Sequence, residues 1–143
     1  MQIISYFDTL PRAQKGYARM LEPVCKKWNL TRNELDILLF LQNNPGLDRA
    51  ADIVSHRGIA RSHVSQSVGL LENKGLLLRV EDSTDRRTIR LRLTQSALPI
   101  AREGQEAQKK FFEQIRRGLS GEELALMREV IRKVCDNIAK MEE

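Results

Sequence analysis

The chain contains few of the residue types on which most enzymes and metal sites depend. It has two cysteines and two histidines among 143 residues, and aromatic residues make up 5% of it. Cys25 and Cys135 lie far apart and form no CxxC motif, which argues against a disulfide framework and suits a reducing compartment. No GxSxG, HExxH, P-loop or GxGxxG pattern occurs. We therefore expect neither an enzyme nor a protein that depends on a metal or cofactor.

Long apolar segments are also absent. No run approaches the roughly 18 apolar residues that a membrane-spanning helix needs. The first residues lack the basic stretch and the cleavage site of a secretory signal. The hydrophobic share of 41% and the charged share of 30% are ordinary for a globular domain. We expect a cytoplasmic protein that does not contact membranes.

Positive charge is concentrated in one segment. The net charge of the chain is +5. Residues 57–92 hold seven arginines and Lys74 against four acidic residues, so this segment supplies +4 of the +5. A basic patch this local indicates a polyanionic partner. The alternative is a charged face that only contacts solvent.

The apolar pattern predicts a mainly α-helical fold with a small β-hairpin. Thr31–Glu34 and Ser120–Glu123 each combine a hydroxyl with a carboxylate three residues later, which is the pattern of a helix capping box. Asp48 and Thr94 are predicted to cap two further helices, and Gly75 to end another. The expected helices cover 1–28, 31–43, 48–56, 60–74, 94–117 and a segment from 120 onward, and the expected strands cover 76–80 and 88–93.

This order of elements is typical of a winged helix-turn-helix, in which the second helix of the pair enters the major groove of DNA. The predicted inward face of that helix is apolar and consists of Val64, Val68 and Leu71. The predicted outward face is small or polar and consists of Ser62, Gln66, Gly69 and Asn73, flanked by His63 and Ser65. Gln66 suits pairing with adenine, and Arg57 and Arg61 are placed for phosphate contacts. A polar solvent-facing side of a surface helix is the alternative.

The predicted hairpin favours the DNA-binding interpretation. Asp85, Arg86 and Arg87 lie at its tip, and Arg90 follows on the second strand. All four are candidate DNA-binding residues. An arginine at the tip of a thin wing can enter a narrow minor groove. Asp85 is expected to hold a wing arginine in one rotamer by a charge-assisted hydrogen bond. A winged helix that binds proteins would instead need an apolar outward face on the preceding helix.

These segments resemble a known family. Residues 59–76 and 82–94 resemble the recognition helix and the wing of MarR-type (multiple antibiotic resistance regulator) proteins, including the Asp-x-Arg at 85–87 and the closing Leu-Thr. The resemblance covers nearly the whole chain. It implies a homodimeric repressor that binds a pseudo-palindromic operator in double-stranded DNA and is released by a small-molecule effector. In the family pattern the positions of Asp85 and Arg87 are wing determinants, and those of Ser62, Ser65 and Gln66 face DNA.

The two ends of the chain are predicted to form the dimer interface. The last helix has apolar residues at spacings of three and four, the pattern of a coiled-coil seam, at Leu124, Met127, Ile131, Val134 and Ile138. Ile4 and Phe7 are the N-terminal candidates. We expect an N-terminal dimerisation helix over 1–30, a winged helix-turn-helix lobe over 31–93 and C-terminal dimerisation helices over 94–143. A core stripe within a single chain is the alternative for the seam.

Cys25 is the candidate for regulation by oxidation. Lys26 and Lys27 beside it are expected to lower the pKa of its thiol. Some members of the family that the chain resembles sense peroxides through a cysteine in the N-terminal helix, although nearer its start. A buried structural cysteine is the favoured interpretation of Cys25, and a thiol-based redox regulator of the same fold is the alternative.

Overall fold

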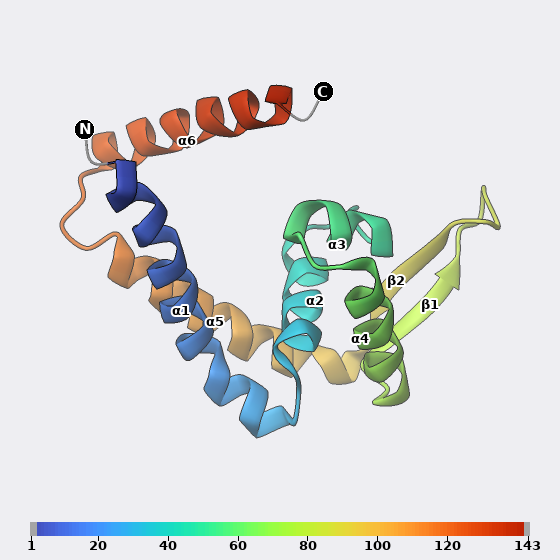
Figure 1. Cartoon of the computed structure of the whole chain (residues 1–143). Coiled ribbons are helices and arrows are strands. Elements are labelled where there is room, and N and C mark those ends of the chain that lie inside the picture. The colour runs from blue at the N-terminus through green and yellow to red at the C-terminus, as the bar shows by residue number, and fades with distance from the viewer. Residues whose placement is uncertain (1–2, 142–143) are drawn as a thin grey trace. The chain divides into compact units, whose positions relative to one another are not determined.

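The computed structural model describes the backbone of residues 3–141 and the side chains of residues 8–141. The elements are α1 (Ile3–Trp28), α2 (Arg32–Asn43), α3 (Ala50–Arg57), α4 (Arg61–Asn73), β1 (Leu77–Glu81), β2 (Ile89–Leu93), a short 3-10 helix (Gln95–Ala97), α5 (Leu98–Ile115) and α6 (Gly121–Met141) (Figure 1). This is the mainly α-helical fold with a β-hairpin that the sequence predicts. The chain forms two compact units, Met1–Lys109 and Lys110–Glu143. Within residues 3–141, none of the helices combines the length and the hydropathy that crossing a membrane requires.

Reciprocal hydrogen bonds set the start of α2 and of α6. Thr31 Oγ1 accepts a hydrogen bond from the Glu34 amide (3.2 Å), and Glu34 Oε2 accepts one from the Thr31 amide (2.7 Å). Ser120 and Glu123 make the same pair of bonds before α6. Each pair satisfies two amides that a helix start leaves without an intrahelical partner. Both predicted capping boxes are confirmed.

The two other predicted caps are wrong. α3 begins after Arg49 rather than after Asp48, because Asp52 in the first turn accepts hydrogen bonds from the amide (3.0 Å) and the side chain of Arg49. Thr94 precedes the 3-10 helix and caps neither that helix nor α5 with its side chain. Its hydroxyl instead donates to the carbonyl of Gly75 (2.7 Å). Thr94 therefore joins the end of β2 to the turn that follows α4.

α2 lies at the centre of the lobe that the first unit forms. It contacts α1, α4 and β2, so Ile37 is buried as well as Leu35, Leu38 and Leu39. The largest fully buried apolar side chains of the lobe are Leu21, Leu35, Ile37, Leu38, Leu39, Ile53, Val64, Val68, Leu71, Leu77 and Ile100. Burial of each such side chain contributes about 1.5–3 kcal/mol. This core fixes α4 from one side.

α1 and α5 are joined by polar contacts at the C-terminal end of α1. Glu103 of α5 accepts hydrogen bonds from Lys27 Nζ (2.6 Å) and Trp28 Nε1 (3.2 Å). α1 continues through both Pro11 and Pro23. The 26-residue helix therefore reaches the lobe as one element.

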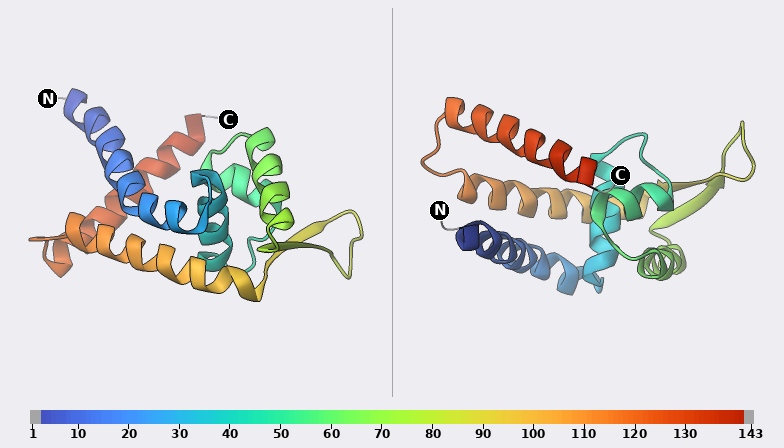
Figure 2. Two further views of the ribbon diagram at one scale, coloured as in Figure 1. Left: turned by 90° about the horizontal axis from the view of Figure 1, so that it is seen from below. Right: turned by 45° about the horizontal axis from the view of Figure 1, so that its top comes forward.

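The hairpin starts at a glycine turn. Gly75 has a φ of +69°, a conformation that glycine adopts without steric cost, and it ends α4. β1 and β2 pair antiparallel with Leu77 opposite Leu93 and Glu81 opposite Ile89, each strand within one residue of its predicted bounds. Leu77 and the central residue of β2 face the core, whereas the distal part of the hairpin extends beyond α2, α3 and α4 (Figure 2).

Candidate nucleic-acid interface

α4 has two chemically different faces, as the sequence predicts. Val64, Val68 and Leu71 are at most 1% exposed and pack toward α2 and α3. Ser67 is buried beside them. The predicted outward side chains are exposed, and they are those of Ser62, His63, Ser65, Gln66 and Asn73. α4 thus offers hydroxyl, imidazole and amide groups to a ligand outside the lobe, and its position is set by the buried face.

The N-terminus of α4 is open to an anion. Gly58, with a φ of +64°, ends α3, and Ala60 occupies the N-cap position of α4 without a side-chain hydrogen bond to the helix amides. The first amides of a helix without a side-chain cap can bind phosphate oxygens. Arg61 is exposed at the first helical position. Arg57, at the end of α3, lies with Nη2 3.5 Å from Asp36 Oδ1.

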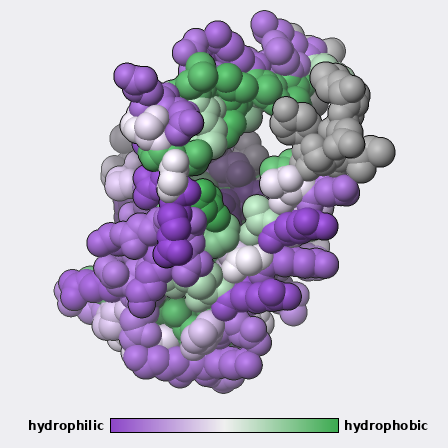
Figure 3. Space-filling view, turned by 90° about the vertical axis from the view of Figure 1, so that its left-hand side faces the viewer, coloured by the Kyte–Doolittle hydropathy of each residue, from purple (hydrophilic) through white to green (hydrophobic). Residues whose placement is uncertain are grey.

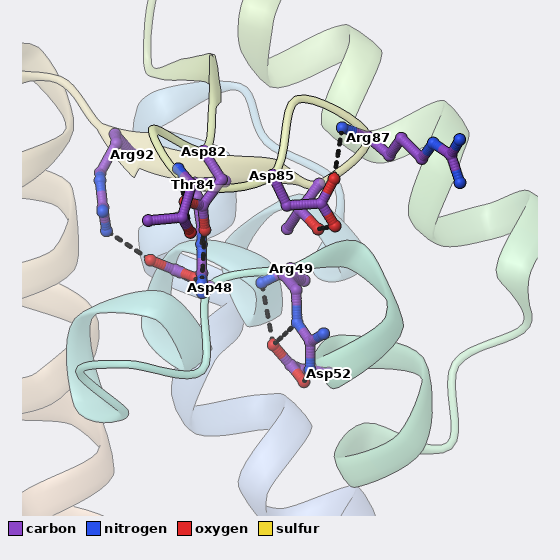
Figure 4. Close-up of polar contacts among 10 residues, drawn as sticks. Asp48, Arg49, Asp52, Asp82, Thr84, Asp85, Arg87 and Arg92 are labelled. Carbon is purple, nitrogen blue, oxygen red and sulfur yellow. Dashed lines mark hydrogen bonds and ion pairs between the residues drawn. The ribbon is translucent and has the colours of Figure 1, made fainter.

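The wing loop, residues 82–88, is shaped by its own aspartates. Asp85 accepts hydrogen bonds from the Arg87 amide (3.0 Å) and from the Thr88 hydroxyl (3.3 Å). The prediction that Asp85 holds an arginine side chain is therefore wrong, since its carboxylate binds the Arg87 amide and the Thr88 hydroxyl instead. Figure 4 shows the guanidinium of Arg87 pointing away from Asp85. Such an aspartate turn fixes the loop and leaves the side chains of Arg86 and Arg87 exposed.

Arg90 has a different environment from the one expected of a DNA contact. Its Nη1 donates to Asp48 Oδ1 (2.7 Å) and its Nε donates to Asp82 Oδ2 (2.8 Å). Arg92 Nη1 also donates to the Asp48 carboxylate. Asp82 accepts further bonds from the amide and the hydroxyl of Thr84 (2.9 Å each). The Thr84 amide and the Arg90 guanidinium hold the pKa of Asp82 well below its usual range.

Ion pairing divides the seven arginines of residues 57–92 into two groups. Four of them have a carboxylate oxygen within 3.5 Å, namely Arg57, Arg79, Arg90 and Arg92. For the other three, Arg61, Arg86 and Arg87, no carboxylate of the described part of the chain lies within 4.0 Å. The unpaired positive charge of this segment therefore lies at the N-terminus of α4 and at the tip of the wing.

Solved structures share this fold along almost the entire chain. A MarR-family transcriptional regulator from Silicibacter pomeroyi is 18% identical, with a TM-score of 0.79 over 91% of this chain and 87% of that chain. A MarR-family regulator from Listeria monocytogenes, complexed with 26mer DNA, is 18% identical, with a TM-score of 0.81 over 98% of this chain and 91% of that chain. BpsR of Bordetella bronchiseptica is 22% identical, with a TM-score of 0.68 over 90% of this chain and 91% of that chain.

The sequence of the lobe matches a known family. Residues 28–88, which span α2 to the end of the wing loop, match the family model of the MarR family. This segment of the chain is a MarR-family domain. The MarR family and its fold are those of transcriptional regulators, so the prediction that the chain is not an enzyme agrees with this match.

α6 carries the apolar stripe that the sequence predicts. Four of the predicted dimerisation residues, Met127, Ile131, Val134 and Ile138, are between 41% and 53% exposed. Leu124 is half-buried, and no residue of α6 is fully buried. Figure 3 shows hydrophobic residues gathered along one side of α6, at the top of the view. The other two dimerisation candidates, Ile4 and Phe7, lie outside the residues whose side chains are described.

Cys25 is half-buried in α1, with Sγ 3.9 Å from the carbonyl of Thr31. Burial raises the pKa of its thiol, and the positive charge that opposes this is that of Arg32. The expectation that Lys26 and Lys27 lower the pKa of the thiol is therefore wrong. A thiol with a raised pKa is a poor nucleophile toward peroxides, because the thiolate is the reactive form.

Proposed function

We propose that this MarR-family regulator binds duplex DNA sequence-specifically as a homodimer. The observation that carries the proposal is the position of the unpaired arginines: Arg61 at the N-terminus of α4, and Arg86 and Arg87 at the wing tip. A strong and local positive charge beside a polar helix face suits a nucleic acid. The Listeria monocytogenes regulator complexed with DNA supports the same partner.

In this proposal α4 enters the major groove. Gln66 reads a base edge through its amide, and Ser62, His63 and Ser65 bind phosphates or base edges. Arg57 and Arg61 bind the phosphate backbone next to the open amides of α4. All of these side chains are exposed on the lobe, and Arg57 would exchange its 3.5 Å contact with Asp36 for a phosphate.

The wing is proposed to enter the adjacent minor groove. Arg86 and Arg87 supply the positive charge, for which a narrow minor groove is the most favourable site on DNA. Asp85 has a supporting role, because it holds the backbone on which both arginines are carried. A rigid loop loses less conformational entropy on binding than a mobile one.

A second copy of the chain is proposed to cover the apolar stripe of α6. The alternation of three- and four-residue spacings from Leu124 to Ile138 is that of helices packed as a coiled coil. In this proposal residues 1–30 and 94–143 form the dimer interface, and residues 31–93 bind DNA. A two-fold dimer places its two α4 helices about one helical turn apart, which requires a pseudo-palindromic operator.

We further propose that the protein is a repressor released by a small organic effector. DNA binding by BpsR is regulated by 6-hydroxynicotinic acid, a small aromatic acid. A cavity of about 330 Å³ lies between α3, α4 and the hairpin, and its lining includes Val54, Arg61, Ser65, Arg79 and Ile89. An apolar cavity with two arginines suits a small organic anion. A ligand there would occupy Arg61 and Ser65, which the proposal also assigns to DNA. Such a regulator acts in the cytoplasm, with the chromosome.

Selection from a random duplex library tests the proposal. Immobilised protein should enrich a pseudo-palindrome whose half-sites are centred about 10 base pairs apart. The matched control is a chain with Arg61, Arg86 and Arg87 replaced by glutamine, which should enrich nothing. Enrichment of single half-sites would argue against the dimer, and no enrichment by the unchanged chain would argue against sequence-specific binding.

A further inference from the structure

Asp48 connects the loop between α2 and α3 to the second strand of the wing. Its two carboxylate oxygens accept hydrogen bonds from Arg90 and Arg92, and its backbone carbonyl accepts one from the amide of Leu91 (2.7 Å). The Asp48 residue is only 7% exposed. All three of its acceptor groups therefore bind consecutive residues of β2, and Figure 4 shows the bond from Arg92.

Arg90 extends this connection to the wing loop. Its guanidinium binds Asp48 through Nη1 (2.7 Å) and Asp82 through Nε (2.8 Å) and Nη2 (2.7 Å). Asp82 in turn fixes the start of the loop through the amide and hydroxyl of Thr84. A continuous set of hydrogen bonds thus runs from the core-anchored loop before α3 to the segment that carries the exposed arginines.

The hairpin needs such a connection because little else holds its outer face. Leu78 and Val80 pair with Arg92 and Arg90 across the sheet and so lie on the same face. They are 54% and 43% exposed, which means that apolar packing does not fix this face in the described chain. An isolated two-stranded hairpin is marginal in water. The orientation of the wing therefore depends on its polar contacts.

We propose that Arg90 is a wing-positioning residue, whose guanidinium bridges Asp48 and Asp82 and thereby sets where Arg86 and Arg87 lie relative to α4. This inference rests on the proposed DNA binding, and it replaces the direct DNA contact that the sequence predicts for Arg90. The bridge requires a planar fork with donors in two directions. Lysine keeps the positive charge, but its single ammonium group cannot reproduce that geometry.

The comparison of Arg90→Lys with Arg92→Lys tests the inference. Arg92 lies two residues away, carries the same charge and donates a single hydrogen bond to Asp48, which a lysine can replace. Arg90→Lys should weaken binding to the selected operator about tenfold, the factor expected when a hydrogen bond between charged groups is lost. Arg92→Lys should stay within about twofold of the unchanged protein, because its one bond can be retained.

A second readout is taken on the protein without DNA. Amide ¹⁵N relaxation should give order parameters of about 0.85 for residues 84–87 in the unchanged protein and in Arg92→Lys, and values below about 0.6 in Arg90→Lys. Normal operator binding by Arg90→Lys together with weak binding by Arg90→Gln would overturn the inference, since any cation would then suffice. Unchanged order parameters in Arg90→Lys would also overturn it. If the unchanged protein binds no DNA, the proposed function fails, and the order parameters still decide whether Arg90 holds the wing.

Discussion

Replacement of Gly69 by alanine should raise the free energy of unfolding by about 1 kcal/mol, the difference in helix propensity between the two residues. Gly69 lies in the interior of α4, and a Cβ at this position meets no atom within 4 Å. Its backbone is not in the left-handed region, so alanine fits the existing conformation. The gain in helix propensity is therefore not offset by a steric cost.

At Gly104 of α5, in contrast, replacement by alanine should destabilise the protein. A Cβ there would lie 2.7 Å from Leu39 Cδ2 and 3.2 Å from two further atoms of Leu39. Leu39 is 2% exposed and has little space into which to move. Overpacking of a core costs about 2 kcal/mol, against a helix-propensity gain of about 1 kcal/mol. Gly104→Ala should therefore lower the free energy of unfolding by about 1 kcal/mol, and the two variants should differ by about 2 kcal/mol.

Urea unfolding followed by far-UV circular dichroism measures both changes. All three proteins are compared at one concentration, because the stability of a dimer depends on concentration. The slopes of the transitions should agree, so that the midpoints report stability. A Gly69→Ala variant less stable than the unchanged protein would refute the reasoning for α4. A Gly104→Ala variant as stable as Gly69→Ala would refute it for the contact between α5 and α2.

Four further predictions concern the interface, the core and the dimer. Arg87→Ala should weaken binding to every duplex and reduce the slope of log affinity against log salt by about 1 in a salt titration; an unchanged slope would contradict wing insertion. Gln66→Ala should lower the preference for operator over random duplex by about 1–3 kcal/mol, as measured by paired titrations, and equal losses on both would exclude base reading. Burial raises the pKa of Glu34, but its hydrogen bonds, led by that from Lys74, outweigh this and hold the pKa below its ordinary 4.5. The Glu34–Lys74 pair therefore stabilises the fold above about pH 4.5, and this stabilisation is lost as the pH falls. Glu34→Gln should flatten the decline in unfolding free energy between about pH 5 and 3. A decline in Glu34→Gln as steep as that of the unchanged protein would argue against a stabilising role of the Glu34 carboxylate. Ile131→Glu should yield monomers in sedimentation equilibrium, and an unaltered dimer would exclude the α6 stripe as the dimer interface.

The parts of the fold that depend on neighbouring residues could be predicted from the sequence. The capping box at Thr31 and the apolar face of α4 are local patterns, with repeats of three or four residues. Both are present in the structure. The strands could be placed within one residue because Gly75 and the polar wing loop bound them.

The polar contacts at the base of the wing could not be predicted in this way. Asp48 resembles a helix cap in the sequence, but its carboxylate binds Arg90, 42 residues later in the chain. No local pattern indicates a partner at that separation. The alternation of Arg90 and Arg92 along β2 shows only that the two side chains share a face. The structure was therefore needed to show which arginines pair with carboxylates and which are unpaired and available to DNA.

The division of the arginines into paired and unpaired groups is the central claim. Fluorescence anisotropy with two labelled duplexes tests it most directly: one from the region upstream of the protein's own gene and one of random sequence and equal length, each at two salt concentrations. We expect the upstream duplex to bind about a thousandfold more tightly than the random one, with an affinity that depends steeply on salt. This salt dependence should largely disappear when Arg61, Arg86 and Arg87 are replaced by glutamine. Absence of binding to either duplex at low salt, or full binding by the triple variant, would contradict it.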